Sequence, residues 1–172
     1  MDKIIKIIMC CIILMSCNQN KNFESKNDNI IFTYQDYIKY DFRLKKINVD
    51  YYGNKFTDSI KISKKEEKLI INSFNENNIG SINGEFYYLD IHSSIPGAND
   101  KIEFKTKLKT NSNFIINSNY EIEDLFFKNQ EYKVVKFRNE IKNVLCKNQD
   151  FKRVLKRYDS LLKKNRKGYF LL

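Results

Sequence analysis

The chain has 172 residues, and its 31 lysines and arginines outnumber 21 aspartates and glutamates, which gives a formal net charge of +10. This length suits one domain with a hydrophobic core of its own. The basic balance is typical of proteins with nucleic acid, a membrane surface or an acidic protein as partner. Lysine, asparagine and isoleucine are abundant, as an AT-rich genome favours, so we expect much of this charge to be a solvated surface.

The amino terminus has the pattern of an export signal. Lys3 and Lys6 precede an apolar run from Ile7 to Met15, which is about half of the ~20 residues that span a bilayer. A short basic start followed by a short apolar core is typical of a secretory signal rather than a transmembrane helix. The alternative is an amino-terminal hydrophobic helix in a cytosolic protein.

The sequence Leu14-Met15-Ser16-Cys17 resembles the lipobox of bacterial lipoproteins, in which an aliphatic, a variable and a small residue precede cysteine. The resemblance covers only residues 1–17. It implies that cleavage falls between Ser16 and Cys17 and that Cys17 carries a diacylglycerol thioether with palmitate-type chains. Two or three such chains anchor a protein stably, because each buried methylene contributes about 0.8 kcal/mol. We therefore expect a lipid-anchored protein of the bacterial cell envelope.

This resemblance divides the chain into three parts: a signal peptide of residues 1–16, a polar flexible tether of residues 17–29, and a single domain of residues 30–172. Cys10 and Cys11 would leave with the signal, so Cys146 would be the one free thiol and no internal disulfide is expected. No dense acidic run follows Cys17, which favours the periplasmic face. An exported protein of this kind is not expected to bind nucleic acid.

The first half of the domain predicts strands around one helix. Residues 30–40 are apolar and aromatic and fit a strand or one helical turn. Gly53-Asn54 between two alternating runs predicts a hairpin, with Tyr51 opposite Phe56 and Ile47 opposite Ile60, although Val49 then faces Asp58. Ser63 and Glu66 form a capping-box pattern that predicts a helix from there to about Asn77.

The second half continues with strands and ends in helices. Residues 85–92 have two apolar faces, which predicts a central strand, and residues 101–109 alternate as a half-exposed antiparallel strand. A turn at residues 110–112 would place Leu108 opposite Phe114. Residues 118–127 predict a short helix, residues 131–147 a longer one with Cys146 on its apolar side, and Asp150 is expected to cap a final helix. The fold class is therefore α+β, with an antiparallel sheet of about five strands, one crossover helix and carboxy-terminal helices.

Few residues suggest chemistry. His92, the sole histidine, lies near Asp90 and Ser93 and could act as a base, but the nucleophile turn G-x-S-x-G is absent. A zinc site needs three or four nitrogen or sulfur ligands, which one histidine and one cysteine do not supply. The acidic group Glu121, Glu123 and Asp124 could hold a cation, yet it also suits a first helical turn.

The last helix carries a basic face with Lys152, Arg153, Lys156 and Arg157. Such a face can lie on anionic lipid, or it can simply be the solvated side of a helix packed on the domain. We therefore expect a non-enzymatic, periplasm-facing binding domain without cofactor or metal. The alternatives are an immunity protein that neutralises a toxin, and an enzyme with an unrecognised site around His92.

Overall fold

The structure is a computed structural model that describes residues 22–89, 98–107, 109–120 and 130–169, with side chains up to Lys163. Its described part contains one sheet, in the order β4-β3-β2-β1-β6-β7-β5. Neighbouring strands are antiparallel except β5 and β7, which are parallel. The strands are β1 (Asp28–Tyr34), β2 (Ile38–Asp41), β3 (Lys46–Tyr51), β4 (Asn54–Ser59), β5 (Gly84–Tyr88), β6 (Asn99–Thr106) and β7 (Lys109–Asn117). The α+β class is confirmed, but the expected five strands are too few.

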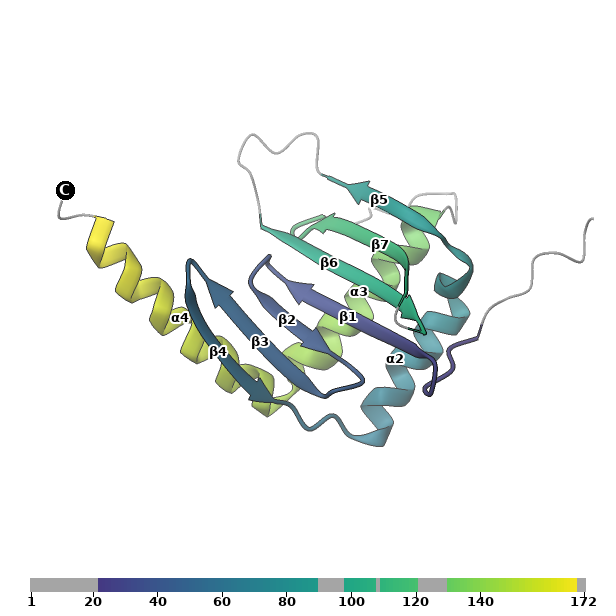
Figure 1. Ribbon diagram of the computed structural model, residues 1–172, viewed down its shortest axis with the longest axis horizontal. Coiled ribbons are helices and arrows are strands. Elements are labelled where there is room, and N and C mark those ends of the chain that lie inside the picture. The colour runs from purple at the N-terminus through teal and green to yellow at the C-terminus, as the bar shows by residue number, and fades with distance from the viewer. Residues whose placement is uncertain (1–21, 90–97, 108, 121–129, 170–172) are drawn as a thin grey trace, which may run out of the picture.

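The helices cover one face of the sheet (Figure 1). They are α2 (Lys64–Glu76), the 3-10 helix η1 (Ile79–Ser81), α3 (Gln130–Lys147) and α4 (Gln149–Tyr169). Helix α2 follows β4 at one edge of the sheet and leads to β5 at the other edge. It is therefore the predicted crossover helix. Because it crosses the sheet, the strands that follow it in the chain (β5, β6 and β7) lie on the far side of β1 from β4.

The core lies between this face and the helices, because alternate residues of each strand point toward them. Ile30 and Phe32 of β1 and Phe104 of β6 are buried there, against Phe137 and Ile141 of α3. Among the described residues, no helix lies over the opposite face, whose centre is charged. Its central carboxylate, Glu103, lies 3.1–3.7 Å from the ammonium groups of three lysines: Lys39, Lys101 and Lys105.

The hairpin β3–β4 is present, but its predicted register is wrong. Tyr51 pairs with Asn54 and Val49 with Phe56, so the two-residue turn is Tyr52-Gly53. Both turn residues have positive φ, 46° and 82°, as this class of hairpin turn requires. The shift is two residues, so every side chain keeps its face. Ile47 and Ile60 are accordingly both buried, although Ile60 lies beyond β4 and Ile47 pairs with Asp58.

Three other strand predictions need correction. Residues 30–40 contain a strand, a turn and the start of a second strand, because β1 and β2 form a hairpin. Strand β5 is an edge strand and not a central one, with Tyr87 exposed. The turn after β6 comes earlier than residues 110–112, since Thr106 pairs with Lys109 and Phe114 faces Ile102; Leu108 itself lies outside the described residues.

The helices agree more closely with expectation. The capping box of α2 is complete, with the Glu66 N–H donating to the Ser63 hydroxyl and the Glu66 carboxylate accepting from the Ser63 N–H at 2.7 Å. Helix α3 matches its prediction within one residue. The cap of α4, however, is Asn148, whose Oδ1 accepts from the N–H groups of Asp150 and Phe151. Asp150 instead accepts from the Lys61 N–H. The predicted helix at 118–127 falls mostly outside the described residues.

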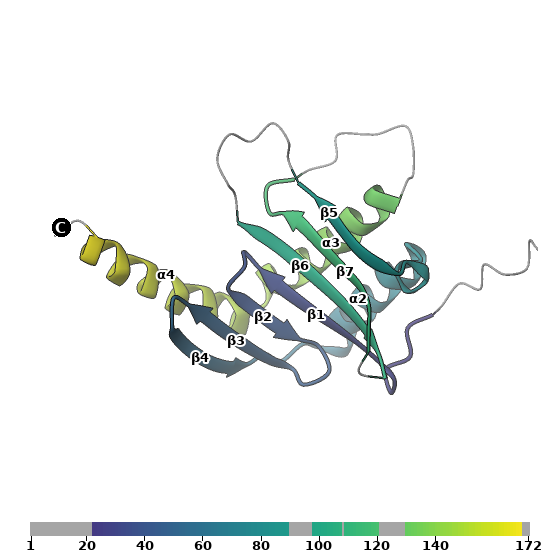
Figure 2. The ribbon, with the colours of Figure 1, turned by 45° about the horizontal axis from the view of Figure 1, so that its top comes forward.

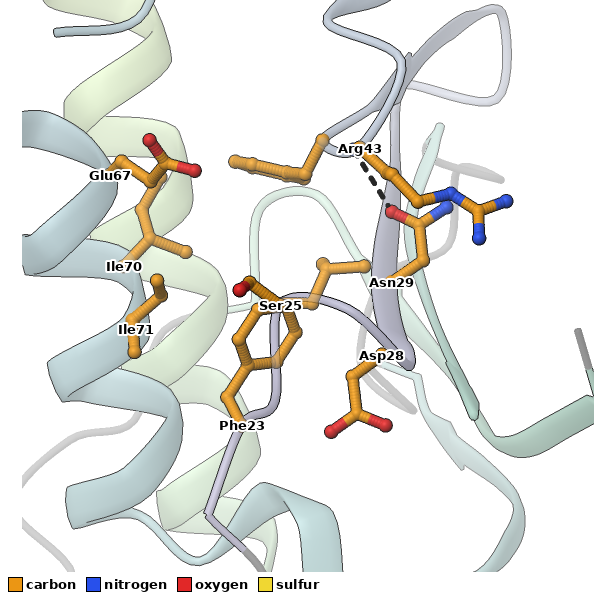
Figure 3. Close-up of a pocket in the computed structure, with 10 residues that line it drawn as sticks. Phe23, Ser25, Asp28, Asn29, Arg43, Glu67, Ile70 and Ile71 are labelled. Atoms are coloured by element: carbon orange, nitrogen blue, oxygen red, sulfur yellow. Dashed lines mark hydrogen bonds between the residues drawn. The ribbon is translucent and has the colours of Figure 1, made fainter. Parts of the chain in front are cut away.

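The segment predicted as a tether contacts the domain at its end. The Phe23 ring packs edge-on against Phe74 of α2 at 5.4 Å, and the Phe23 N–H donates to Asn75. Figure 3 shows Phe23 beside Ile70 and Ile71, where these side chains line a pocket of about 50 Å³. Residues 23–29 of the predicted tether therefore include contacts with the domain.

Candidate binding surface

Four tyrosines from three segments of the chain meet at the end of the sheet where the β1–β2 and β3–β4 turns lie. The Tyr51 ring lies 4.9 Å from Tyr37, 4.8 Å from Tyr52 and 5.5 Å from Tyr158 of α4, measured between centroids. The ring planes of these three pairs are steeply inclined, an arrangement that aromatic pairs favour. Tyr158 is buried, whereas Tyr52 at the tip is 74% exposed.

The backbone at Tyr52 is unusual for such a residue. Its φ of 46° lies in the left-handed region, which a bulky side chain seldom adopts. Turns of this geometry favour asparagine or glycine at that position. A tyrosine there costs on the order of 1 kcal/mol of stability, so we expect its ring to have a role that offsets this cost.

Two hydroxyl groups in this cluster, those of Tyr37 and Tyr158, stay protonated at neutral pH because their pKa values are raised. A hydrogen bond with Tyr52, followed by burial and the nearby tyrosines, raises the pKa of Tyr37 to about 12. Burial is also the main reason why the pKa of Tyr158 is raised. The cluster therefore presents aromatic surface and neutral hydroxyl groups, which can both donate and accept hydrogen bonds.

Helix α4 places basic side chains beside these tyrosines. Its apolar side packs on the sheet through Phe151, Val154 and Tyr158, all buried, and its end projects past the β3–β4 turn (Figures 1 and 2). The predicted basic residues Lys152, Arg153, Lys156 and Arg157 are all exposed, as is Lys163. We call Tyr37, Tyr51, Tyr52 and these five cations the Tyr/α4 surface.

The two arginines and the three lysines of this surface differ in their contacts. Arg153 pairs with Asp58 of β4 at 3.2 Å and with Asp150 at 2.9 Å. The Arg157 guanidinium lies 3.9 Å from the centre of the Phe56 ring. Among the described residues, Lys152, Lys156 and Lys163 form no ion pair. The arginines thus hold α4 against β4, while the lysines remain available to a partner.

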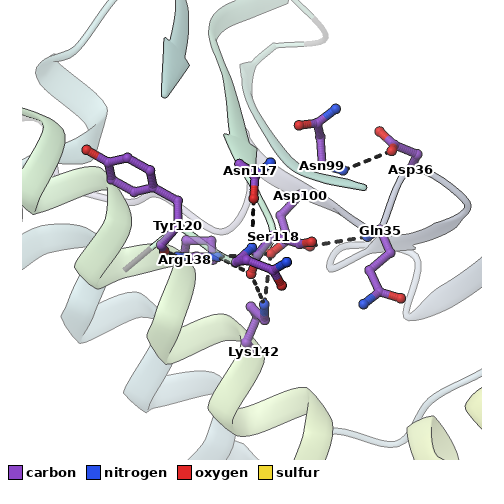
Figure 4. Close-up of polar contacts among 10 residues, drawn as sticks. Gln35, Asp36, Asn99, Asp100, Asn117, Ser118, Tyr120, Arg138 and Lys142 are labelled. Carbon is purple, nitrogen blue, oxygen red and sulfur yellow. Dashed lines mark hydrogen bonds and ion pairs between the residues drawn. The ribbon is translucent and has the colours of Figure 1, made fainter. Parts of the chain in front are cut away.

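A second polar cluster is buried and structural (Figure 4). The carboxylate of Asp100 on β6 lies 3.2 Å from the guanidinium of Arg138 and 3.0 Å from the ammonium of Lys142, both on α3. Its other oxygen accepts from the Gln35 N–H in the β1–β2 turn. Arg138 also donates to the carbonyls of Ser118 and Tyr120 after β7. This cluster joins α3 to strand β6 and to two loops.

Most of the other predicted site residues lie outside the described part: Cys17, His92, Glu121, Glu123 and Asp124. Cys146 is half-buried, and burial raises the pKa of its thiol, which agrees with an unreactive cysteine. Within the described ranges, three or more His, Cys, Asp or Glu side chains nowhere gather as metal ligands would. None of the described helices has both the length and the apolar character of a membrane span.

Comparisons with protein-family models, with curated proteins and with solved structures each found no match to this chain. The tyrosine cluster was not predicted from the sequence, which placed Tyr51 in a hairpin strand opposite Phe56. The one available signal was the pair Tyr52-Gly53, which takes the place of an asparagine-glycine turn.

Proposed function

We propose that this chain is a lipid-anchored lipoprotein of the bacterial envelope, facing the periplasm, whose domain binds an acidic protein without catalysis. The observation that carries the binding role is the tyrosine cluster beside the free lysines of α4. Tyrosine and arginine are enriched among the residues that dominate the energy of protein interfaces. Here both are held in place by the domain itself, so little conformational entropy is lost when a partner binds.

The tyrosine cluster supports an acidic protein more than a lipid surface. Arg153 and Arg157 are already bound to β4, so the lysines supply the charge for either kind of acidic partner. A lipid surface would also gain little from a rigid tyrosine cluster at a hairpin tip, whereas a protein can surround Tyr52 on all sides. Contact of Lys152, Arg153, Lys156 and Arg157 with anionic lipid is the outcome that would replace this proposal.

The anchor is tested by mass spectrometry of the mature amino terminus. An acylated Cys17 is expected, together with release from membranes in the Cys17→Ser variant. An unmodified chain that starts at Met1 would contradict the anchor, but it would leave the binding surface untouched.

The binding surface is tested by cross-linking in the native envelope, followed by purification of the protein with its partner. We compare Tyr52→Ala with Tyr87→Ala, because Tyr87 is also an exposed tyrosine (59%) but lies on β5 at the other edge of the sheet. Loss of an interface anchor typically costs 2 kcal/mol or more, so recovery of the partner should fall about tenfold or more with Tyr52→Ala only. Equal recovery with both variants would refute the assignment.

An immunity protein is the second candidate, since a rigid basic surface suits tight inhibition of an acidic toxin. A toxin gene beside the gene for this chain would favour it. Binding of that toxin should then depend on Tyr52 and on the lysines of α4 in the same way.

A further inference from the structure

A second candidate site lies at the edge of the sheet away from the Tyr/α4 surface. There the end of α2, η1, the start of β5 and the first turn of α3 enclose a pocket of about 270 Å³. A single water needs about 10–15 Å³ of such space, so the pocket is large enough for a ligand of the size of one sugar ring. The pocket at Phe23 is far smaller, at about 50 Å³.

The lining of this pocket is rich in groups that bind hydroxyls. Its lining residues include Asn77, Asn83 and Gln130, which carry amides, Ser81, which carries a hydroxyl, and Phe86 and Lys133. An amide can donate and accept hydrogen bonds, as can a hydroxyl, so the two pair in either direction. No carboxylate is among the described lining residues.

The protein forms hydrogen bonds with the nitrogen atoms of these amides. Asn77, which is 5% exposed, donates to the Ser73 carbonyl at 2.7 Å. Asn83 donates to the Ser81 carbonyl, and Gln130 donates to the Tyr88 hydroxyl. Among the described residues, none donates a hydrogen bond to the three side-chain carbonyl oxygens. These oxygens are therefore oriented acceptors that a ligand can use.

Lys133 gives the pocket its charge preference. Its side chain is half-buried and makes neither an ion pair nor a hydrogen bond with the described residues. It is the one cation among the described lining residues, and no carboxylate lines the pocket with it, so it favours an anionic group there. Phe86 stacks on Phe114 with one face, at 5.7 Å between centroids, and its remaining surface suits the apolar C–H side of a sugar ring.

We propose that this pocket binds a small polyhydroxylated anion of the acidic-sugar class. The carboxylate pairs with Lys133, the hydroxyls donate to the oxygens of Asn77, Asn83 and Gln130, and the ring lies on Phe86. The proposal is independent of the partner at the Tyr/α4 surface, because the two sites share no residue.

The test is a titration of the mature chain carrying Cys17→Ser with small ligands. Binding is measured by calorimetry and by the shifts of amide NMR signals. Glucuronate is the probe, glucose supplies the hydroxyls without charge, and acetate supplies the charge without hydroxyls. Glucuronate should bind saturably and about tenfold or more tightly than either of the others. Absence of saturable binding at millimolar glucuronate, or equal binding of acetate, would overturn the proposal.

The matched variants are Lys133→Gln and Lys136→Gln. Both remove one lysine from the same helix, but Lys136 is exposed and does not line the pocket. Lys133→Gln should lower the glucuronate affinity to that of glucose, whereas Lys136→Gln should leave it unchanged. Thermal unfolding checks that both variants are folded. Asn83 is exposed, so Asn83→Ala is an additional variant, and it should weaken the binding of glucuronate and of glucose alike. Binding that is unaffected by Lys133→Gln and Asn83→Ala would refute the site.

Discussion

Asp100 is the residue on which the buried charges converge. Among the described residues, its carboxylate is the one anion paired with Arg138 and Lys142, and it has no exposure to solvent. Replacing one partner of a buried ion pair typically costs 3–5 kcal/mol, because the remaining charge is left without compensation. We predict that Asp100→Asn lowers the free energy of unfolding in urea by about 3 kcal/mol or more.

The control for this prediction is Asp50→Asn, which breaks the ion pair between Asp50 and Lys55 at 3.0 Å. Both of these side chains are more than half exposed, so the change should stay within about 1 kcal/mol. Similar costs for the two variants would show that the Asp100 cluster is not a buried network of the kind described.

Tyr52 is a bulky residue in a left-handed backbone conformation that such residues seldom adopt. Tyr52→Asn and Tyr52→Ala both remove the ring, but asparagine tolerates the left-handed backbone better than alanine does. We predict that Tyr52→Asn is the more stable of the two by about 0.5–1 kcal/mol, measured by thermal unfolding, while both lose the partner of the Tyr/α4 surface. Equal stability would mean that the turn has relaxed to another conformation.

At the scale of the element, the start of α2 offers a prediction with a defined pH dependence. Hydrogen bonds from the Ser63 side chain and backbone lower the pKa of Glu66 below its usual 4.5. Because the pKa is lowered in the folded state, its stabilising effect is complete above pH 4.5 and disappears as the pH falls through the folded-state value. We predict that Ser63→Ala costs about 1 kcal/mol at pH 7, and less at pH 3.

The matched comparison is Glu66→Gln, which keeps the side-chain length but removes the titrating group. Its unfolding curve should depend less on pH than that of the natural chain in the acid range. An unchanged pH dependence would assign the acid sensitivity to other carboxylates.

The elements also show which parts of the fold the sequence could predict. Helices α2 and α3 were predicted because their signals are local: a capping box at Ser63–Glu66 and an apolar repeat from Val134 to Leu145. The register of β3–β4 depends on which two residues turn, and two registers that differ by two residues keep the same faces. The observed register requires Tyr52 in a left-handed conformation, which no local preference indicates.

At the scale of the whole molecule, the candidate sites depend on contacts that are distant in sequence. Tyr37, Tyr51 and Tyr158 come from three segments that meet only once the sheet has formed and α4 has packed on it. The pocket near β5 similarly needs α2 to cross the sheet and α3 to return beside it. The spacing of apolar residues predicts the buried side of each helix, but it does not predict which loops lie next to one another. The sequence predicted that the basic residues of α4 are exposed. It did not predict that the arginines contact β4 while the lysines form no ion pair with the described residues.

Helix α4 joins stability and function in one element, and its two sides can be separated by mutation. Val154 is 1% exposed, so Val154→Asp should abolish cooperative unfolding, because an unpaired carboxylate cannot be accommodated in the core. The triple variant Lys152→Gln, Lys156→Gln and Lys163→Gln should change the free energy of unfolding by less than about 0.5 kcal/mol, as is usual at such surfaces. It should nevertheless weaken binding of the acidic partner, and the remaining affinity should depend less on salt than that of the natural chain. A folded Val154→Asp protein would show that α4 is not part of the core, and unchanged salt dependence in the triple variant would show that these lysines do not face the partner.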